Sequence, residues 1–362
     1  PASAGGIQAS SETIAAGIVT AIGTISGITV TRNGSVIKLV STNTNFTVSV
    51  KDGLSDIGLG MAYKEVTAIT DLPKSCYDDF RVKVKGDVEL VQDDYYVKFA
   101  TKDDEDFGEG SWEEDIGYGV LKSLDATTMP IKLIPRASDT NYKLIAPGHD
   151  VSVTNEAAWT ERKVGDDDSN DFPSFVGNSI TDIFFFKNRL GLLTGQNVIF
   201  SEADEYGNFF RTTVLSLLDS APIDVGVAHT KVSLLKHAIP FQEKLVLFSP
   251  QSQFVLRGAD LLTPSTVNIS PITEYNVNVD VSPLALSNYI YFPFERGDFQ
   301  GIYEFFVDSN TDVFDASEVT SHVPKYINKT IKQLVGTPAE DVIVATCNAV
   351  GAEKQIFEYK YF

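Results

Sequence analysis

Four histidines are the residues of this sequence best suited to acid–base or metal chemistry near neutral pH. They are His149, His229, His237 and His322. They form neither the H-x-x-x-H nor the H-E-x-x-H pattern of a helical zinc site. The sequence also lacks a G-x-S-x-G nucleophile elbow and a Walker-type phosphate loop. We therefore expect structural or surface roles for the histidines, and a protein that is not an enzyme.

Carboxylates are abundant, with 49 Asp and Glu residues, but their spacing does not form a metal motif. In GDDDSNDFPSF, Asp166, Asp168 and Asn170 have the alternate spacing that begins a calcium loop. Asp171 replaces the glycine required at the sixth position, and Gly177 replaces the glutamate at the twelfth. A second stretch fails in the same way, with Val313 at the sixth position after Asp308, Asn310 and Asp312. We interpret both as solvated acidic turns, with a calcium site as the alternative, and expect no metal or cofactor.

Composition narrows the class of protein further. The chain has 362 residues, of which 43% are hydrophobic and 11% aromatic, as in a folded protein of two or three domains. Its formal net charge of −20 argues against holding a nucleic-acid backbone, which needs clustered Lys and Arg. Cys76 and Cys347 form no C-x-x-C pair, so we expect reduced, buried thiols.

Neither a membrane span nor a secretory signal is evident. No run of 18 apolar residues occurs, and the first residues lack the basic start of a signal peptide. The sequence also has no initiator Met and stops inside an apolar strand pattern. We expect it to be one part of a longer polypeptide.

The elements that would position any site begin with a small α+β domain, residues 1–66. Ser10 or Ser11 can cap a helix that Gly23 ends, with an apolar face at helical spacing. Asn33-Gly34 between two β-branched runs predicts a hairpin whose central residues both have positive φ. The stretch NFTVSVKDG is expected to add a third strand. The apolar face of the helix consists of Ile14, Ala15, Ile18 and Ile22.

Residues 67–150 are interpreted as a β-meander domain with one solvated face. Val82 and Val84, and then the YYVKF stretch, alternate between polar and apolar positions, with acidic turns between them. The stretch KDDEDFGEGSWEED that follows is expected to be a mobile acidic loop.

Residues 151–362 are interpreted as a propeller-like β-domain. After about residue 180, hairpins recur at starts about 45 to 55 residues apart, close to the span of a four-stranded propeller blade. They occupy residues 189–202, 244–258, 288–306 and 341–362. The predicted fold class is therefore mainly β with α+β insertions, and the alternative is a β-sandwich with long connections.

A family resemblance extends from about residue 25 to the end of the sequence and is densest in one region. That region begins WTERKVGDDDSNDFPSFVGNSITDIFFFKNRLGLLTGQNVIFSEADEYGNFF and continues into DSAPIDV. Its motif positions are Trp159, Arg162, Gly165 to Asp167, Pro173 to Phe175, Phe185 to Gly191, Asn197-Val198 and Phe209-Phe210. In these motifs and their order the chain resembles the nozzle proteins, or tail tubular proteins B, of short-tailed bacteriophages of the autographivirus type. The stretch before Trp159, PRASDTNYKLIAPGHDVSVTNEA, follows the family only loosely.

The resemblance implies a structural virion protein in a short non-contractile tail, with no cofactor. Such nozzles form a ring, here expected to be hexameric, around the DNA channel; the ring retains the genome and allows its exit during ejection. Implied partners are further copies of the chain, the tail adaptor (tubular protein A), tail fibres, and genomic DNA that passes without specific binding. The resemblance also implies a propeller-like domain combined with smaller domains.

The resemblance suggests roles for two groups of residues. We hypothesise that acidic loops face the channel or a neighbouring subunit, where like charge would keep DNA from adhering. The candidates are Asp103, Asp104, Asp106, Asp166, Asp167 and Asp168. The alternative for any one loop is a solvated turn. The motif residues expected to act structurally are Trp159, Arg162, Asn188, Arg189 and Gly191.

The FFFKNRLGLL region illustrates the structural interpretation. We expect Phe184 to Phe186 and Leu190 to Leu193 to form strands buried on both faces, with Asn188-Arg189 tying the strand junction to backbone. The following SEADEYGNFF is expected to be an exposed loop between blades.

Two other functions compete with the structural one. A propeller-type carbohydrate-binding or glycan-degrading tail protein would need a cleft of aromatics and carboxylates, for which Tyr206, Phe209 and Glu202 to Asp204 are candidates. A monomeric adhesion module from a bacterial surface protein is the third possibility.

Overall fold

The computed structural model describes residues 10–41, 45–53, 58–86, 93–103, 105–135, 142–145, 159–230, 232–258, 261–308, 313–328, 330–348 and 355–360. The protein is mainly β, as predicted, and forms two compact units. Unit 1 consists of Pro1–Leu121, Lys163–Asn170 and Thr213–Leu215. Unit 2 consists of Lys122–Arg162, Asp171–Thr212 and Ser216–Phe362.

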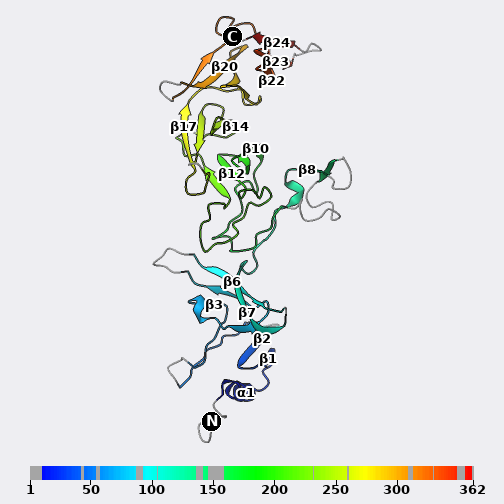
Figure 1. Ribbon diagram of the computed structural model, residues 1–362, viewed down its shortest axis with the longest axis vertical. Helices are drawn as coiled ribbons and strands as arrows, with labels where there is room; N and C mark the ends of the chain where they lie inside the picture. The colour runs from blue at the N-terminus through cyan, green and yellow to red at the C-terminus, as the bar shows by residue number, and fades with distance from the viewer. Residues whose placement is uncertain are drawn as a thin grey trace. The chain divides into compact units, whose positions relative to one another are not determined.

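Unit 1 begins with the predicted helix and hairpin (Figure 1). Helix α1 spans Ser11–Ile22; the Ser10 side chain accepts a hydrogen bond from the Thr13 N–H at its start, and Gly23 ends it with φ +60°. Strands β1 (Ile28–Asn33) and β2 (Val36–Ser41) pair in antiparallel register.

Two predictions near this hairpin are wrong in detail. Asn33 pairs with Val36 and so belongs to β1, which leaves Gly34 and Ser35 as the turn, one residue later than expected. The stretch NFTVSVKDG, residues 45–53, forms no strand. Its alternating pattern supplies only propensity, whereas a strand also requires a neighbour to take its hydrogen bonds.

The larger part of unit 1 is a five-stranded sheet in the order β3-β5-β6-β7-β4. The strands are β3 (Glu65–Val66), β4 (Ser75–Tyr77), β5 (Arg81–Val84), β6 (Tyr95–Thr101) and β7 (Phe107–Asp115), and a 3₁₀ turn spans Ile69–Asp71. β5 and β6 alternate between buried and half-buried residues, as the sequence predicts. Val82, Val84, Val97 and Phe99 are almost completely buried.

The stretch predicted as a mobile acidic loop is largely strand β7, so that prediction is wrong. Of the described residues in this stretch, only 102–103 and 105–106 lie between β6 and β7. Trp112 in β7 packs edge-on against Phe99 and donates through Nε1 to the Pro73 carbonyl at 2.9 Å. A Cβ on Gly110 would lie 2.0 Å from the Ala100 carbonyl oxygen, so glycine here permits close strand approach.

Unit 2 contains a short hairpin and four larger antiparallel sheets (Figure 1). The hairpin is β8 (Lys132–Pro135) with β9 (Tyr142–Ile145), after a 3₁₀ turn at Ala126–Thr128. The first sheet contains β10 (Ile180–Phe186), β11 (Arg189–Thr194), β12 (Asn197–Phe200) and β13 (Ile223–Gly226). The second contains β14 (His237–Phe241), β15 (Lys244–Phe248), β16 (Gln253–Arg257) and β17 (Asn268–Thr273).

The third and fourth sheets continue the same pattern. The third contains β18 (Leu284–Leu286), β19 (Tyr289–Arg296), β20 (Phe299–Val307) and β21 (Phe314–Glu318). The fourth contains β22 (Thr330–Thr337), β23 (Val342–Asn348) and β24 (Gln355–Lys360). In each of these four sheets the strands follow sequence order. The four hairpins expected from the sequence are β11–β12, β15–β16, β19–β20 and β23–β24.

Consecutive sheets share apolar cores. One core joins the first and second sheets, another the second and third, and a third core joins the third and fourth. The opposite face of the first sheet is covered by a separate layer that includes Trp159, Phe175, Phe209 and Phe210. The described sheets do not close into a propeller, and the three domains expected from the sequence stay a prediction.

The FFFKNRLGLL region shows where the expectation of burial on both faces fails. All six residues of β11 are buried, but β10 alternates, with Phe184 and Phe186 buried and Phe185 62% exposed. The covering layer packs on Leu190, Leu192 and Ile199 of the next two strands and leaves Phe185 uncovered.

The SEADEYGNFF stretch is also placed differently from the prediction. It begins the connection between β12 and β13 within one sheet, rather than a loop between sheets. Phe209 and Phe210 at its end are buried, because they belong to the covering layer.

Candidate functional site

The family-motif residues of unit 2 gather on and around the first sheet. Trp159 is buried beside Phe209, with ring centroids 5.9 Å apart, and Phe209 in turn packs edge-on against Phe175. Lys132 places its Nζ 4.1 Å from the Trp159 ring centroid, and burial lowers the pKa of this ammonium group. These contacts make Trp159 the centre of an aromatic layer.

Arg162 lies in the same layer and is 1% exposed. Its guanidinium carbon is 4.3 Å from the Phe172 ring centroid and 5.5 Å from that of Phe210. The planar cation thus stacks among aromatic faces, a favourable arrangement for arginine in a dry environment. Its backbone N–H donates to the Lys122 carbonyl at 2.7 Å.

Arg189, the first residue of β11, forms hydrogen bonds with both ends of the β12–β13 connection. Its side chain is 1% exposed and donates to four backbone carbonyls at 2.8 to 3.1 Å. The carbonyls belong to Ser201, Asp219, Ser220 and Ala221. Burial lowers the pKa of the guanidinium, partly offset by Glu202 and Asp204, but arginine remains protonated.

Asn188 and Gly191 shape the backbone on either side of Arg189. Lys187 and Asn188 form the β10–β11 turn with φ values of 47° and 59°, and the Asn188 carbonyl accepts from the Asp204 N–H at 3.0 Å. A Cβ on Gly191 would lie 2.2 Å from the Phe184 ring, which covers this position. The described contacts of these motif residues are packing and backbone hydrogen bonds.

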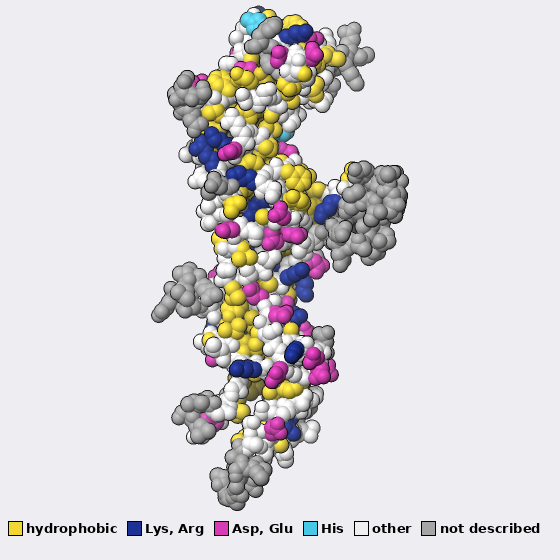
Figure 2. All heavy atoms as spheres, in the orientation of Figure 1, with side chains coloured by type: hydrophobic (Ala, Val, Ile, Leu, Met, Phe, Trp, Pro, Cys, Tyr) yellow, Lys and Arg dark blue, Asp and Glu magenta, His cyan; other side chains and the backbone are white. Residues whose placement is uncertain are grey.

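The acidic candidates lie in two exposed turns of unit 1. Asp103 and Asp106 are exposed in the β6–β7 turn, and Asp104 lies outside the described residues. Asp167 and Asp168 are exposed, whereas Asp166 is half-buried. On the face seen in Figure 2, acidic side chains form small separate groups interspersed with basic ones.

The turn that begins at Asp166 is organised by its own hydrogen bonds. Its Oδ1 accepts from the Asp168 N–H, the Ser169 N–H and the Ser169 hydroxyl at 2.9 to 3.2 Å. Asn170 donates from its side-chain amide to the Val164 carbonyl. Asn310 and Asp312 of the second candidate calcium turn lie outside the described residues. Among the residues that the structure describes, no group of three or more His, Cys, Asp or Glu residues could hold a metal ion.

The described histidines make isolated structural contacts. His237 is hydrogen-bonded through Nε2 to the Val279 carbonyl at 2.8 Å, His229 packs edge-on against Phe254, and His322 lies near Tyr359. His149 lies outside the described residues. Cys76 and Cys347 are buried free thiols, and burial raises the pKa of each. The helix of the described chain is too short to cross a bilayer.

The proposed sugar cleft is not formed. Phe209 is buried in the aromatic layer, while Tyr206 packs against the exposed ring of Phe185. Glu202 accepts from the Asn208 side-chain amide at 2.6 Å and lies 3.5 Å from the Ser220 hydroxyl, so it ties the loop together. The aromatic and acidic groups therefore do not converge on a shared surface.

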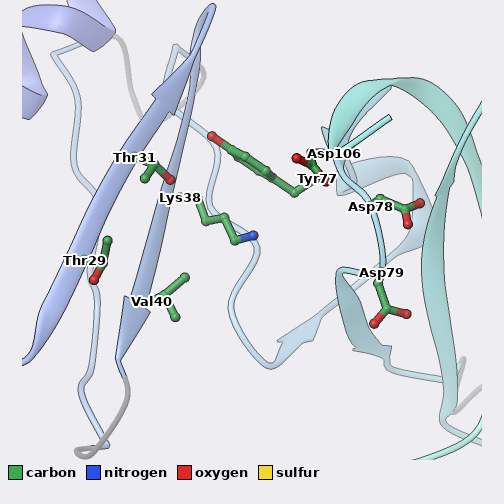
Figure 3. A pocket seen from close by; sticks show the side chains of 8 residues that line it. All are labelled: Thr29, Thr31, Lys38, Val40, Tyr77, Asp78, Asp79 and Asp106. Carbon is green, nitrogen blue, oxygen red and sulfur yellow. The ribbon is translucent and has the colours of Figure 1, made fainter. Parts of the chain in front are cut away.

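A hollow of about 580 Å³ in unit 1 lies between the β1–β2 hairpin and β4 (Figure 3). Lys38 reaches from β2 toward Tyr77, with its Nζ 4.4 Å from the ring centroid. Asp78, on the other wall, accepts from the Thr101 N–H and hydroxyl. The hollow includes Asp106 but presents no nucleophile paired with a base.

Sequence reasoning missed one long-range anchor. Glu114 in β7 accepts hydrogen bonds from the Thr213 hydroxyl at 2.5 Å and the Val214 N–H at 2.9 Å. About a hundred residues separate the partners, so no local pattern could have identified them.

Comparison with known proteins gives a consistent assignment. A family model described as "Bacteriophage nozzle protein" matches residues 2–362. "Tail tubular protein gp12" of Escherichia phage T7 is 32% identical over 314 residues, which cover 86% of this chain and 37% of that protein. The chain thus spans little more than a third of the length of this relative.

Solved structures resemble the chain only weakly. The N-terminal domain of Nup159 has 8% identity and a TM-score of 0.31, over 51% of this chain and 45% of that one. The AfRom2 CNH domain has 10% identity and a TM-score of 0.31, over 84% and 72%. TM-scores this low do not establish a shared fold.

Proposed function

Because the chain belongs to the bacteriophage nozzle protein family, we propose that it forms part of the distal tail tube of a short-tailed phage. It is a structural component of the virion tail and not an enzyme. The observation that carries the proposal is the family match over residues 2–362, supported by the collinear relative from phage T7.

The contacts of the motif residues agree with a structural role. Arg162 stacks on an aromatic ring, and Arg189 donates hydrogen bonds to backbone carbonyls. Gly191 is covered by the ring of a phenylalanine. Side chains buried in this way stabilise a rigid sheet and present no free group to a substrate. We propose that the motif residues form the rigid core of a tail subunit.

We further propose that six copies form a closed ring around the DNA channel. A ring follows when the rotation in a head-to-tail contact closes on itself, and a single subunit cannot enclose a channel. The adaptor above, the tail fibres beside it, and DNA passing through without specific binding would be its partners. The net charge of −20 supports weak wall contacts, because a negative wall repels phosphate.

The acidic turns remain candidates for the channel wall or a subunit contact. Asp103, Asp106, Asp167 and Asp168 are exposed and can take either role or face solvent. Neutralising all four to Asn should leave folding intact and increase DNA retention by assembled tails in low salt. Unchanged DNA retention at every salt concentration would show that these four residues do not line the channel.

We also propose that the four sheets of unit 2 are consecutive propeller blades and that residues 1–66, 67–150 and 151–362 act as separate domains. Three of the sheets have four antiparallel strands in sequence order, and each sheet packs on the next, as propeller blades do. The full-length protein would be needed to close the propeller.

Labelling of phage particles tests the tail assignment. Antibodies against the 362-residue chain, detected by immunogold electron microscopy, should decorate the end of the short tail. Native mass spectrometry of the full-length protein should also give a closed oligomer, with six subunits expected. Labelling confined to the capsid, with monomers at every salt concentration, would contradict the proposal.

A further inference from the structure

The outer edge of β24 is the one place in the described part of unit 2 where the repeating sheet pattern is unfinished. In each of the first three sheets a fourth strand pairs antiparallel with the third: β13 on β12, β17 on β16 and β21 on β20. In the fourth sheet β22, β23 and β24 pair in the same order, and β24 has one described neighbour, β23.

Burial differs between β24 and the corresponding strands. Three of four residues of β12, four of five of β16 and four of nine of β20 are buried, whereas β24 alternates between half-buried and exposed residues. Phe357 and Tyr359 face the core between the third and fourth sheets but remain only partly buried. Ile356, on the opposite face, is 71% exposed. An edge strand that exposes aromatic and β-branched side chains is a template for further pairing.

We propose that the outer edge of β24 binds a fourth antiparallel strand of the same polypeptide, from chain beyond residues 1–362. In the complete sheets the third and fourth strands are joined by residues 201–222, 258–267 and 308–313. The last of these shows that a connection of six residues is sufficient. Additional chain is consistent with the T7 relative, of which this chain covers 37%.

The face of β24 defines the chemistry of that strand. Its core-facing side chains must be apolar, because they would cover the remaining exposed area of Phe357 and Tyr359. The other face must accommodate Ile356, Glu358 and Lys360, which are all exposed. An alternating strand with charged or β-branched residues on that face fits both requirements.

Hydrogen exchange measured by mass spectrometry tests the proposal. The 362-residue chain is compared with the natural full-length protein, both isolated as monomers by size exclusion. Every second backbone N–H of β24 should exchange rapidly in the 362-residue chain and be protected at least tenfold in the full-length monomer. Strand β21 is the matched control, since it is the outermost strand of a complete sheet and should exchange equally in both.

The other outcomes overturn the proposal. Equal protection of β24 in both proteins would mean that its edge is already closed within residues 1–362. Equal lack of protection would mean that no strand is added. Protection only in an oligomer would mean that a second copy of the chain supplies the pairing strand. A natural polypeptide that ends at residue 362 would leave no further chain to supply it. None of these results depends on a ring or on a tail location.

Discussion

Replacing Arg189 tests whether its hydrogen bonds to backbone carbonyls stabilise the first sheet of unit 2. Arg189→Met keeps a long apolar side chain but removes all four hydrogen bonds to the β12–β13 connection. Two of these bonds, to Ser201 and Ala221, are buried, and two are partly buried. A buried acceptor that loses its partner costs about 1–3 kcal/mol, and partly buried acceptors can turn to water.

The expected loss of unfolding free energy is therefore about 3–5 kcal/mol, reduced from a simple sum because a buried cation is also removed. Arg189→Lys should cost about 1.5–3 kcal/mol, since one ammonium group cannot serve four carbonyls spread over two chain segments. Arg296→Met is the matched control: its side chain is 42% exposed and pairs with Glu318, so the cost should stay below about 1 kcal/mol.

Urea unfolding followed by tryptophan fluorescence provides the measurement. The chain has two tryptophans, so a Trp112→Phe background leaves Trp159, in the layer that packs on Leu190 of β11, as the reporter of unit 2. A loss for Arg189→Met no larger than that of the Arg296 control would refute the reasoning. Full stability of Arg189→Lys would show that charge alone is sufficient and that the four-point geometry is not used.

Three further predictions concern stability, each measured by denaturant unfolding. Gly191→Ala should cost about 1–3 kcal/mol because its Cβ would lie 2.2 Å from a phenylalanine ring; Gly108→Ala, with open space, should change stability by less than about 0.5 kcal/mol. Glu114→Gln should cost about 1–2 kcal/mol through two weakened hydrogen bonds, and equal losses in Glu113→Gln would contradict this. A hydrogen bond from Lys83 lowers the pKa of Asp94. The stabilisation that this ionised carboxylate gives the folded state is therefore fully present above the ordinary Asp pKa, and it is lost as pH falls through the lowered folded-state pKa. Asp94→Asn should therefore remove about 0.3–0.5 kcal/mol of the acid destabilisation between pH 6 and 2; an unchanged pH profile would refute this.

Local elements could be predicted from sequence because their signals are local. Ser10 caps α1 and Gly23 ends it as expected, and the hairpin at 244–258 follows from two apolar runs around a polar turn. The resemblance gave the family, since its motifs extend in order along the chain. Neither inference requires knowledge of the tertiary contacts between elements.

The details that failed depend on tertiary neighbours. Phe185 has the same sequence character as Phe184 and Phe186, but the covering layer does not extend over it. The glycines of DFGEGSW suggest a loop, although Gly110 allows close pairing between two strands. The anchor at Glu114 joins residues about a hundred positions apart.

We propose that this chain is a subunit of a ring around the DNA exit channel at the end of a phage tail. Cryo-electron microscopy of the intact particle tests it most directly. We expect the sheets of unit 2 and the five-stranded sheet of unit 1 to fit density at the distal tail, in six copies around a continuous channel. Fit of the chain only to density away from the tail axis, with no ring of copies around the channel, would contradict the account.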